Sequence, residues 1–106
     1  MKNNELKNYV DGIAADLRKA YEDDEEIGSL YDYLADALDV EYIISGNGEF
    51  LGARLAVTLG GPNVWIDSRE GLVKGYWGTE REEAWIPSEI CDCINFQFED
   101  LYRCLK

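Results

Sequence analysis

Carboxylates are the abundant chemical groups of this sequence, with 22 Asp and Glu residues among 106 against 10 Lys and Arg. A pair of carboxylates can transfer protons in catalysis or hold Mg²⁺. With so many candidates, spacing singles out no pair, and a solvated acidic surface is the simpler interpretation. Nucleophile dyads that pair Cys or Ser with His are excluded because the chain has no histidine. We therefore expect a protein that is not an enzyme and that needs no cofactor.

The three cysteines, Cys91, Cys93 and Cys104, all lie in the last 16 residues. Their odd number favours reduced thiols over a disulfide framework. Structural zinc usually takes four Cys or His ligands, and Cys91 and Cys93 on a helix would point about 200° apart. We therefore expect no metal site, and interpret the cysteines as packing or surface thiols.

The acidic residues are unevenly distributed along the chain. Residues 1–53 have 13 acidic and 4 basic side chains, a net charge of -9, whereas residues 54–106 have 9 and 6, a net charge of -3. Within the first half, residues 22–41 contain nine carboxylates and no Lys or Arg, and we call these nine the acidic segment. Its members, the candidate partner-binding residues, are Glu22, Asp23, Asp24, Glu25, Glu26, Asp32, Asp36, Asp39 and Glu41.

Three of these carboxylates, Asp32, Asp36 and Asp39, would line one face of a helix predicted over about residues 29–38. Their steps along that face would be about 5–6 Å, and the repulsion would cost about 0.2–0.5 kcal/mol for each pair. Such a row resembles the line of phosphates on a nucleic acid strand. The pattern predicts a nucleic-acid mimic that occupies the basic groove of a nucleic-acid-processing protein and so inhibits a DNA-targeting enzyme.

The net charge of -12 argues against direct binding to nucleic acid or to an anionic membrane, because both would repel the chain. Residues 1–5 lack the apolar core of a signal peptide, and no run of about 18 apolar residues occurs. We therefore expect a cytoplasmic protein whose partners are basic.

Hydrophobic periodicity predicts the elements that position these groups. A stripe formed by Leu6, Val10, Ile13 and Leu17 indicates a helix over residues 5–21. Helices are also predicted over residues 29–38 and from Ser88 to the end of the chain, strands over 40–45, 50–59, 64–67 and 72–77, and a candidate short fifth strand over 84–86. The predicted fold is a single α+β domain spanning residues 1–106, with two N-terminal helices, a four-stranded antiparallel meander and a C-terminal helix packed on the sheet.

The tryptophans suggest an alternative binding surface. If Val64 and Ile66 face the core, Trp65 faces the other way, and Trp77 on the same side would complete an exposed pair that anchors a protein partner. In the other arrangement, a helix covers each face of the sheet and both tryptophans are buried. The exposed pair would suit a protein–protein interaction module or a self-associating protein such as a homodimer.

Three parts of the sequence form a recognisable set. They are Leu59-Gly60-Gly61-Pro62-Asn63-Val64-Trp65-Ile66-Asp67, Gly75-Tyr76-Trp77-Gly78, and the closing helix Ile90 to Tyr102 with Phe98-Glu99-Asp100-Leu101-Tyr102. Together they resemble a family of small acidic proteins carried on bacterial conjugative elements and phages. The resemblance covers roughly residues 30–105 and brings no catalytic residue, because the family is largely uncharacterised. It implies a context of antirestriction and anti-CRISPR genes, and hence an inhibitor of a host DNA-targeting nuclease.

Overall fold

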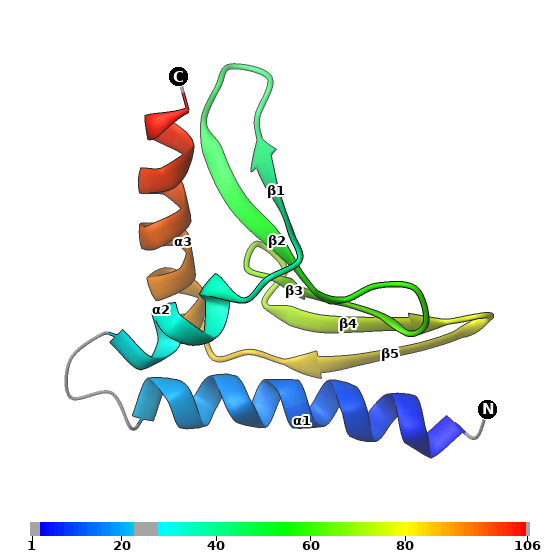
Figure 1. The fold of residues 1–106 in the computed structure, drawn as a ribbon. Helices are drawn as coiled ribbons and strands as arrows, with labels where there is room; N and C mark the ends of the chain where they lie inside the picture. Colours follow the sequence, from blue (N-terminus) through cyan, green and yellow to red (C-terminus); the bar gives the residue numbers. More distant parts are fainter. Residues whose placement is uncertain (1–2, 23–27, 106) are drawn as a thin grey trace.

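The computed structural model describes residues 3–22 and 28–105, in which three helices pack against one antiparallel sheet (Figure 1). This arrangement confirms the predicted α+β class. The sheet is a meander in which each strand pairs with the next, in the order β1-β2-β3-β4-β5. The elements are α1 (Asn3–Glu22), α2 (Gly28–Ala35), β1 (Asp39–Ile44), β2 (Phe50–Thr58), β3 (Asn63–Asp67), β4 (Leu72–Trp77), β5 (Glu80–Trp85) and α3 (Ser88–Cys104).

The fifth strand is longer than the sequence pattern suggested. β5 begins at Glu80 instead of Ala84, and it pairs residue by residue with β4 from Trp77–Glu80 to Leu72–Trp85. Most residues of β5 are charged, so this strand lacks the alternation of apolar and polar residues from which strands are predicted. Because β5 is an edge strand, charged side chains are well tolerated there and discourage pairing with another chain.

The second helix is shorter than predicted, because the sheet captures the chain that follows it. α2 ends at Ala35, and the backbone N–H of Ala37 closes the last turn on the carbonyl of Leu34 at 3.2 Å. The next N–H group, that of Leu38, donates to the carbonyl of Ala56 in β2 at 2.8 Å. The chain therefore enters β1 where the sequence pattern continued the helix.

All three helices pack on one face of the sheet. Figure 1 shows α1 running along β5 and β4, while α3 stands beside the β1–β2 hairpin. The buried side chains of the helices and of this sheet face form one hydrophobic cluster. At Gly75 of β4, the missing side chain lets α1 approach closely, because an added Cβ would overlap Val10 and lie 3.0 Å from Cδ1 of Leu6. The arrangement with a helix on each face is therefore wrong for the described residues.

The turn between β3 and β4 ties the sheet to α3. Oδ1 of Asp67 accepts hydrogen bonds from the backbone N–H groups of residues 69–70, at 3.0 and 2.9 Å. The buried hydroxyl of Ser68 accepts from the N–H of Ala53 at 2.9 Å and donates to Oδ1 of Asn95 at 2.6 Å. These bonds hold the middle of α3, at Asn95, against the β3–β4 turn and β2.

Candidate functional site

The two ends of the acidic segment lie in different elements. Glu22 is the last residue of α1 and is exposed, and residues 23–26 lie outside the described residues. Glu41 lies in β1, where its Oε1 accepts a hydrogen bond from Nη1 of Arg54 at 2.9 Å. This partner comes from the neighbouring strand, so one carboxylate of the segment is neutralised by a base that is distant in sequence.

The predicted helical row of Asp32, Asp36 and Asp39 is not formed. Because α2 ends at Ala35, only Asp32 lies in the helix, while Asp36 follows it in a turn. Asp39 is the first residue of β1, where its Oδ1 accepts the N–H of Val40 at 2.9 Å. The regular spacing that would resemble a row of phosphates is therefore absent. All three carboxylates are nevertheless exposed, and none forms an ion pair with the described part of the chain.

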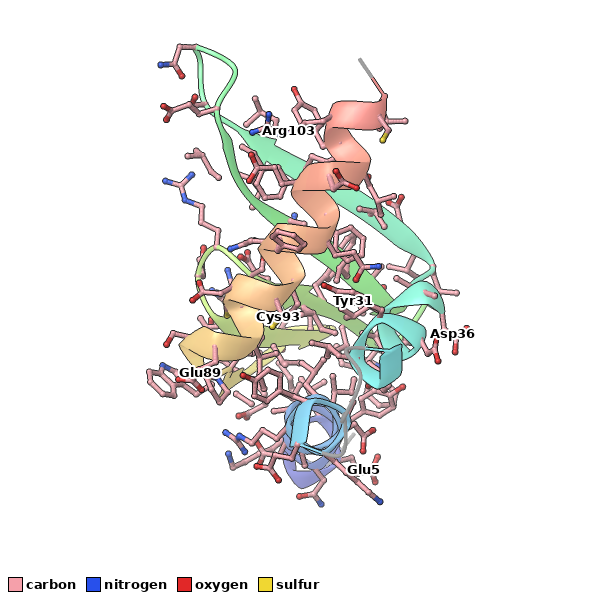
Figure 2. The ribbon with its side chains drawn as sticks, turned by 90° about the vertical axis from the view of Figure 1, so that its left-hand side faces the viewer. Glu5, Tyr31, Asp36, Glu89, Cys93 and Arg103 are labelled. Carbon is pink, nitrogen blue, oxygen red and sulfur yellow. The ribbon has the colours of Figure 1, made fainter. Side chains whose placement is uncertain are left out.

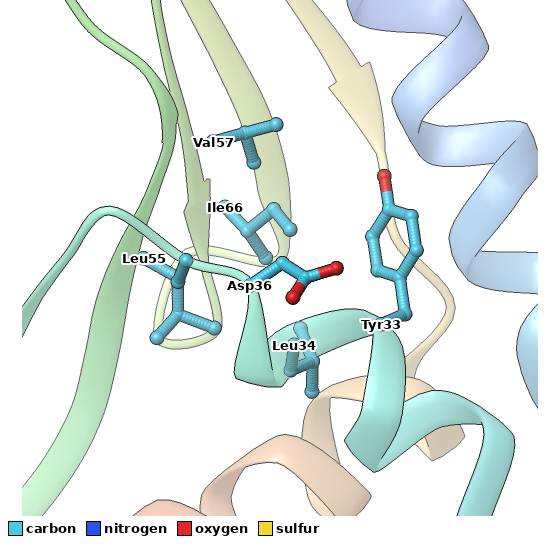
Figure 3. A pocket seen from close by; sticks show the side chains of 7 residues that line it. Tyr33, Leu34, Asp36, Leu55, Val57 and Ile66 are labelled. Carbon is cyan, nitrogen blue, oxygen red and sulfur yellow. The ribbon is translucent and has the colours of Figure 1, made fainter.

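An apolar pocket of about 130 Å³ lies between α2 and the sheet, next to Asp36. Figure 3 shows the carboxylate of Asp36 directed between Leu34 and Tyr33. Sequence reasoning missed this pocket, because its walls come from strands whose approach to α2 is not visible in a local pattern. The sequence contains one indication of the pocket. Tyr33 follows Leu30 by three residues, which places the Tyr33 ring beside the inner face of the helix. The lining residues are Tyr33, Leu34, Asp36, Ala37, Leu55, Val57 and Ile66.

A fourth carboxylate, Asp16 of α1, influences the pKa of Tyr33 in the lining of this pocket. Burial, the negative charge of Asp16 and the neighbouring Tyr9 together raise the pKa of Tyr33 to about 12. A phenol with the ordinary pKa of 10.0 is already neutral near pH 7, and the raised pKa keeps the hydroxyl proton of Tyr33 in place at higher pH as well. Lys19 follows Asp16 by three residues, yet it makes no ion pair with the described chain. We name Asp16, Asp32, Asp36 and Asp39 the acidic surface.

Several basic residues are engaged elsewhere. Arg54 and Lys74 lie on the sheet face that no described helix covers, with Nε and Nζ at 4.0 and 3.8 Å from Oδ2 of the buried Asp67. On α1, Nη2 of Arg18 donates to the carbonyl of Trp85 at 3.3 Å, on the side of the helix that meets β5. These cations are therefore held away from the acidic surface.

Trp65 and Trp77 lie on opposite faces of the sheet, so the exposed pair is not formed. Strand alternation places Trp77 with Gly75 on the face that packs against α1, where it is 38% exposed. Trp65 lies on the uncovered face, half-buried, with the guanidinium of Arg54 at 4.5 Å from its ring centroid. The most exposed tryptophan is Trp85, at 70%, which shares the face of Trp65 and was not singled out from the sequence.

The three cysteines of α3 are free thiols with different exposure. Cys91 is buried, Cys93 is half-buried and Cys104 is exposed. Burial, with nearby carboxylates, raises the pKa of Cys91 to about 11, so that its thiol remains protonated near neutral pH. Within residues 3–22 and 28–105, no three His, Cys, Asp or Glu side chains come together in a group that could hold a metal ion.

No helix in the described ranges is both long and apolar enough to cross a membrane. Comparisons with protein-family models, curated proteins and solved structures find no significant match to this chain. The function of the protein is therefore inferred from its own surface.

Proposed function

We propose that this protein is a non-enzymatic binding protein whose acidic surface engages a basic surface of a nucleic-acid-processing protein. One observation carries the proposal. The four carboxylates of the acidic surface come from α1, α2, the turn that follows α2, and β1, and they form no ion pair with the described chain. By contrast, Glu41 and Glu70 near the uncovered sheet face are paired, Glu70 with Lys74 at 2.5 Å. Glu49, Glu89 and Asp100 in other parts of the fold are also unpaired within the described chain, but only the acidic surface adjoins a stretch, residues 22–41, that contains no Lys or Arg.

The physical basis is the exchange of one polyanion for another. A groove that binds nucleic acid holds it largely by pairing Lys and Arg with phosphates, and the affinity falls steeply with salt. Fixed carboxylates can take the place of those phosphates, and a net charge of -12 speeds the encounter with a cationic partner. The proposal rests on this complementarity and not on the spacing of a helical row. The resemblance to small acidic proteins of conjugative elements and phages narrows the proposed function to inhibition of a host DNA-targeting enzyme, of the anti-CRISPR or antirestriction type.

A second candidate function is protein binding or self-association through the uncovered face of the sheet. The exposure of Trp85 favours it, because large exposed aromatic rings are common anchors of interfaces. Two other rings on this face are already engaged by internal cations, Trp65 by Arg54 and Tyr76 by Arg81, whose guanidinium lies 5.6 Å from the ring centroid. The acidic surface, which has no such internal partners, is therefore the better supported interface.

Reversal of charge on the acidic surface tests the proposal. The variant Asp32→Lys, Asp36→Lys, Asp39→Lys is immobilised beside the unaltered protein and exposed to a bacterial lysate at about 50 and 500 mM salt. We expect the unaltered protein to capture basic nucleic-acid-binding proteins at low salt, and at least tenfold less at high salt. A duplex oligonucleotide should displace the captured proteins, because it competes for the same groove.

A matched control separates position from total charge. The variant Glu49→Lys, Glu89→Lys, Asp100→Lys changes the net charge by the same amount at three exposed carboxylates in other parts of the fold. Figure 2 shows Glu89 on the opposite side of the view from Asp36. We expect the first variant to lose capture and the control to retain most of it, with circular dichroism confirming that both are folded. Equal capture by both variants, or capture that does not respond to salt, would overturn the proposal.

A further inference from the structure

The pocket beside Asp36 has the size of one side chain. Its volume is about 130 Å³, and an apolar protein cavity of about 150 Å³ is known to hold one benzene molecule. Leu34 and Ile66 form buried walls, and Val57 is half-buried at the side. The pocket therefore has apolar walls and a volume that a single inserted side chain would fill.

The edge of the pocket is negative. The carboxylate of Asp36 is exposed, and it forms no ion pair with the described residues. Tyr33 also lines the pocket, and its neutral phenol lies within the field of Asp16. No Lys or Arg belongs to the lining described above. An anionic side chain would be repelled here, and a cationic one attracted.

We propose that this pocket receives one lysine side chain of the basic partner, an inference that rests on the proposed function. The four-carbon stem lies across Leu34, Val57 and Ile66, and the ammonium group meets the carboxylate of Asp36 at the edge. A neutral apolar side chain would remove water from Asp36 without replacing its hydrogen bonds. Arginine has a shorter aliphatic stem than lysine and a larger polar guanidinium group, so it fits an apolar pocket of this size less well.

Two capped pentapeptides test the site on the full chain. One has the sequence Gly-Gly-Lys-Gly-Gly, and the other has norleucine in place of lysine, so that only the ammonium group is missing. Methyl NMR spectra follow Leu34, Val57 and Ile66 during titration at low salt. We expect the lysine peptide to shift these methyl signals and to bind about fivefold more tightly than the norleucine peptide, the ratio expected for one partly exposed ion pair.

Substitutions at the edge and in the pocket identify the contacts. Asp36→Asn should reduce the preference for lysine over norleucine from about fivefold to about one. Asp100→Asn is the matched control, because it removes the same charge at an exposed residue of α3 that neither lines the pocket nor belongs to the acidic surface. It should leave the preference unchanged. Ala37→Leu places three further carbon atoms at the lining and should abolish the shifts caused by either peptide.

The outcomes separate this inference from the proposed function. Equal affinity for the two peptides, or an equal loss of preference in Asp36→Asn and Asp100→Asn, would overturn the lysine site. If the preference is absent while the triple charge reversal still abolishes lysate capture, the pocket inference alone fails. If the preference is present while the triple reversal leaves capture intact, the proposed function alone fails.

Discussion

Replacement of Gly75 by Ala tests whether α1 lies directly on β4. Gly75 is buried, and an added Cβ would overlap Cγ2 of Val10 and lie 3.0 Å from Cδ1 of Leu6. Both of these side chains are 0% exposed, so neither can turn into solvent to make room. The substitution must therefore push α1 away from the sheet or distort the strand.

The magnitude follows from two opposing effects. Insertion of a methyl group into a well-packed core costs about 1–3 kcal/mol. Replacement of glycine by alanine also lowers the conformational entropy of the unfolded chain. This effect alone would raise the free energy of unfolding by about 0.4–1 kcal/mol. The free energy of unfolding should therefore fall by about 1–2 kcal/mol. For a domain of this size, Tm should fall by roughly 5–15 °C.

Urea denaturation followed by tryptophan fluorescence, with calorimetry for Tm, measures this effect. Gly12→Ala is the matched control, because Gly12 is exposed in α1 and an added Cβ would have nothing within 4 Å. In a helix interior, alanine is favoured over glycine by about 0.8–1.0 kcal/mol. The same chemical change should thus stabilise the protein at Gly12 and destabilise it at Gly75.

A double-mutant cycle with Val10→Ala makes the prediction refutable. Val10→Ala alone leaves a cavity, and the methyl group of Gly75→Ala would partly fill it. The double variant should therefore be more stable than the sum of the two single effects, by at least about 0.5 kcal/mol. If Gly75→Ala is neutral or stabilising, or if the two changes are additive, α1 does not contact β4 in this way.

Two further predictions concern titrating groups. The pKa of Tyr33, raised from 10.0 to about 12, predicts that stability declines as the pH rises between these values, because the unfolded chain releases this proton first. Asp16→Asn should lower that pKa, as measured by NMR titration of the ring, and Asp11→Asn should not; an equal change in both would contradict the assignment. The pKa of Cys91 is raised from 9.0 to about 11, so at pH 8 this residue should have about a hundredfold less thiolate than a thiol with the ordinary pKa. A disulfide reagent should therefore label the exposed Cys104 before the buried Cys91. Rapid labelling of Cys91 in the folded protein would refute this.

The helices and strands with a clear period were predictable from the sequence. The stripe from Leu6 to Leu17 identifies α1, and alternation through Ala53 and Leu55 identifies β2, because burial of one face leaves a period of 3.6 or 2 in the residue types. Where charged residues carry the strand, as in β5, the period is masked. The end of α2 was not predictable, since it depends on a hydrogen bond from Leu38 to a strand residue 18 positions later.

The candidate site was predictable only in part. The sequence predicts exposure of the carboxylates that the structure describes in the acidic segment, because so acidic a stretch cannot be buried without partners. They are Glu22, Asp32, Asp36, Asp39 and Glu41, and all five are exposed. It does not show that Glu41 meets Arg54, nor that Asp36 stands at a pocket whose walls include residues of β2 and β3. These contacts join residues far apart in the chain, so no local pattern contains them.

By itself, the sequence determined the fold class, the excess of negative charge and its concentration in residues 22–41, because these depend on composition and on short-range periodicity. The tertiary structure decided which carboxylates stay unpaired, which tryptophan shares a face with which, and where an apolar pocket opens beside Asp36. The physical reason is that strand register and helix placement set the distances between residues remote in sequence. Charge and burial act through those distances.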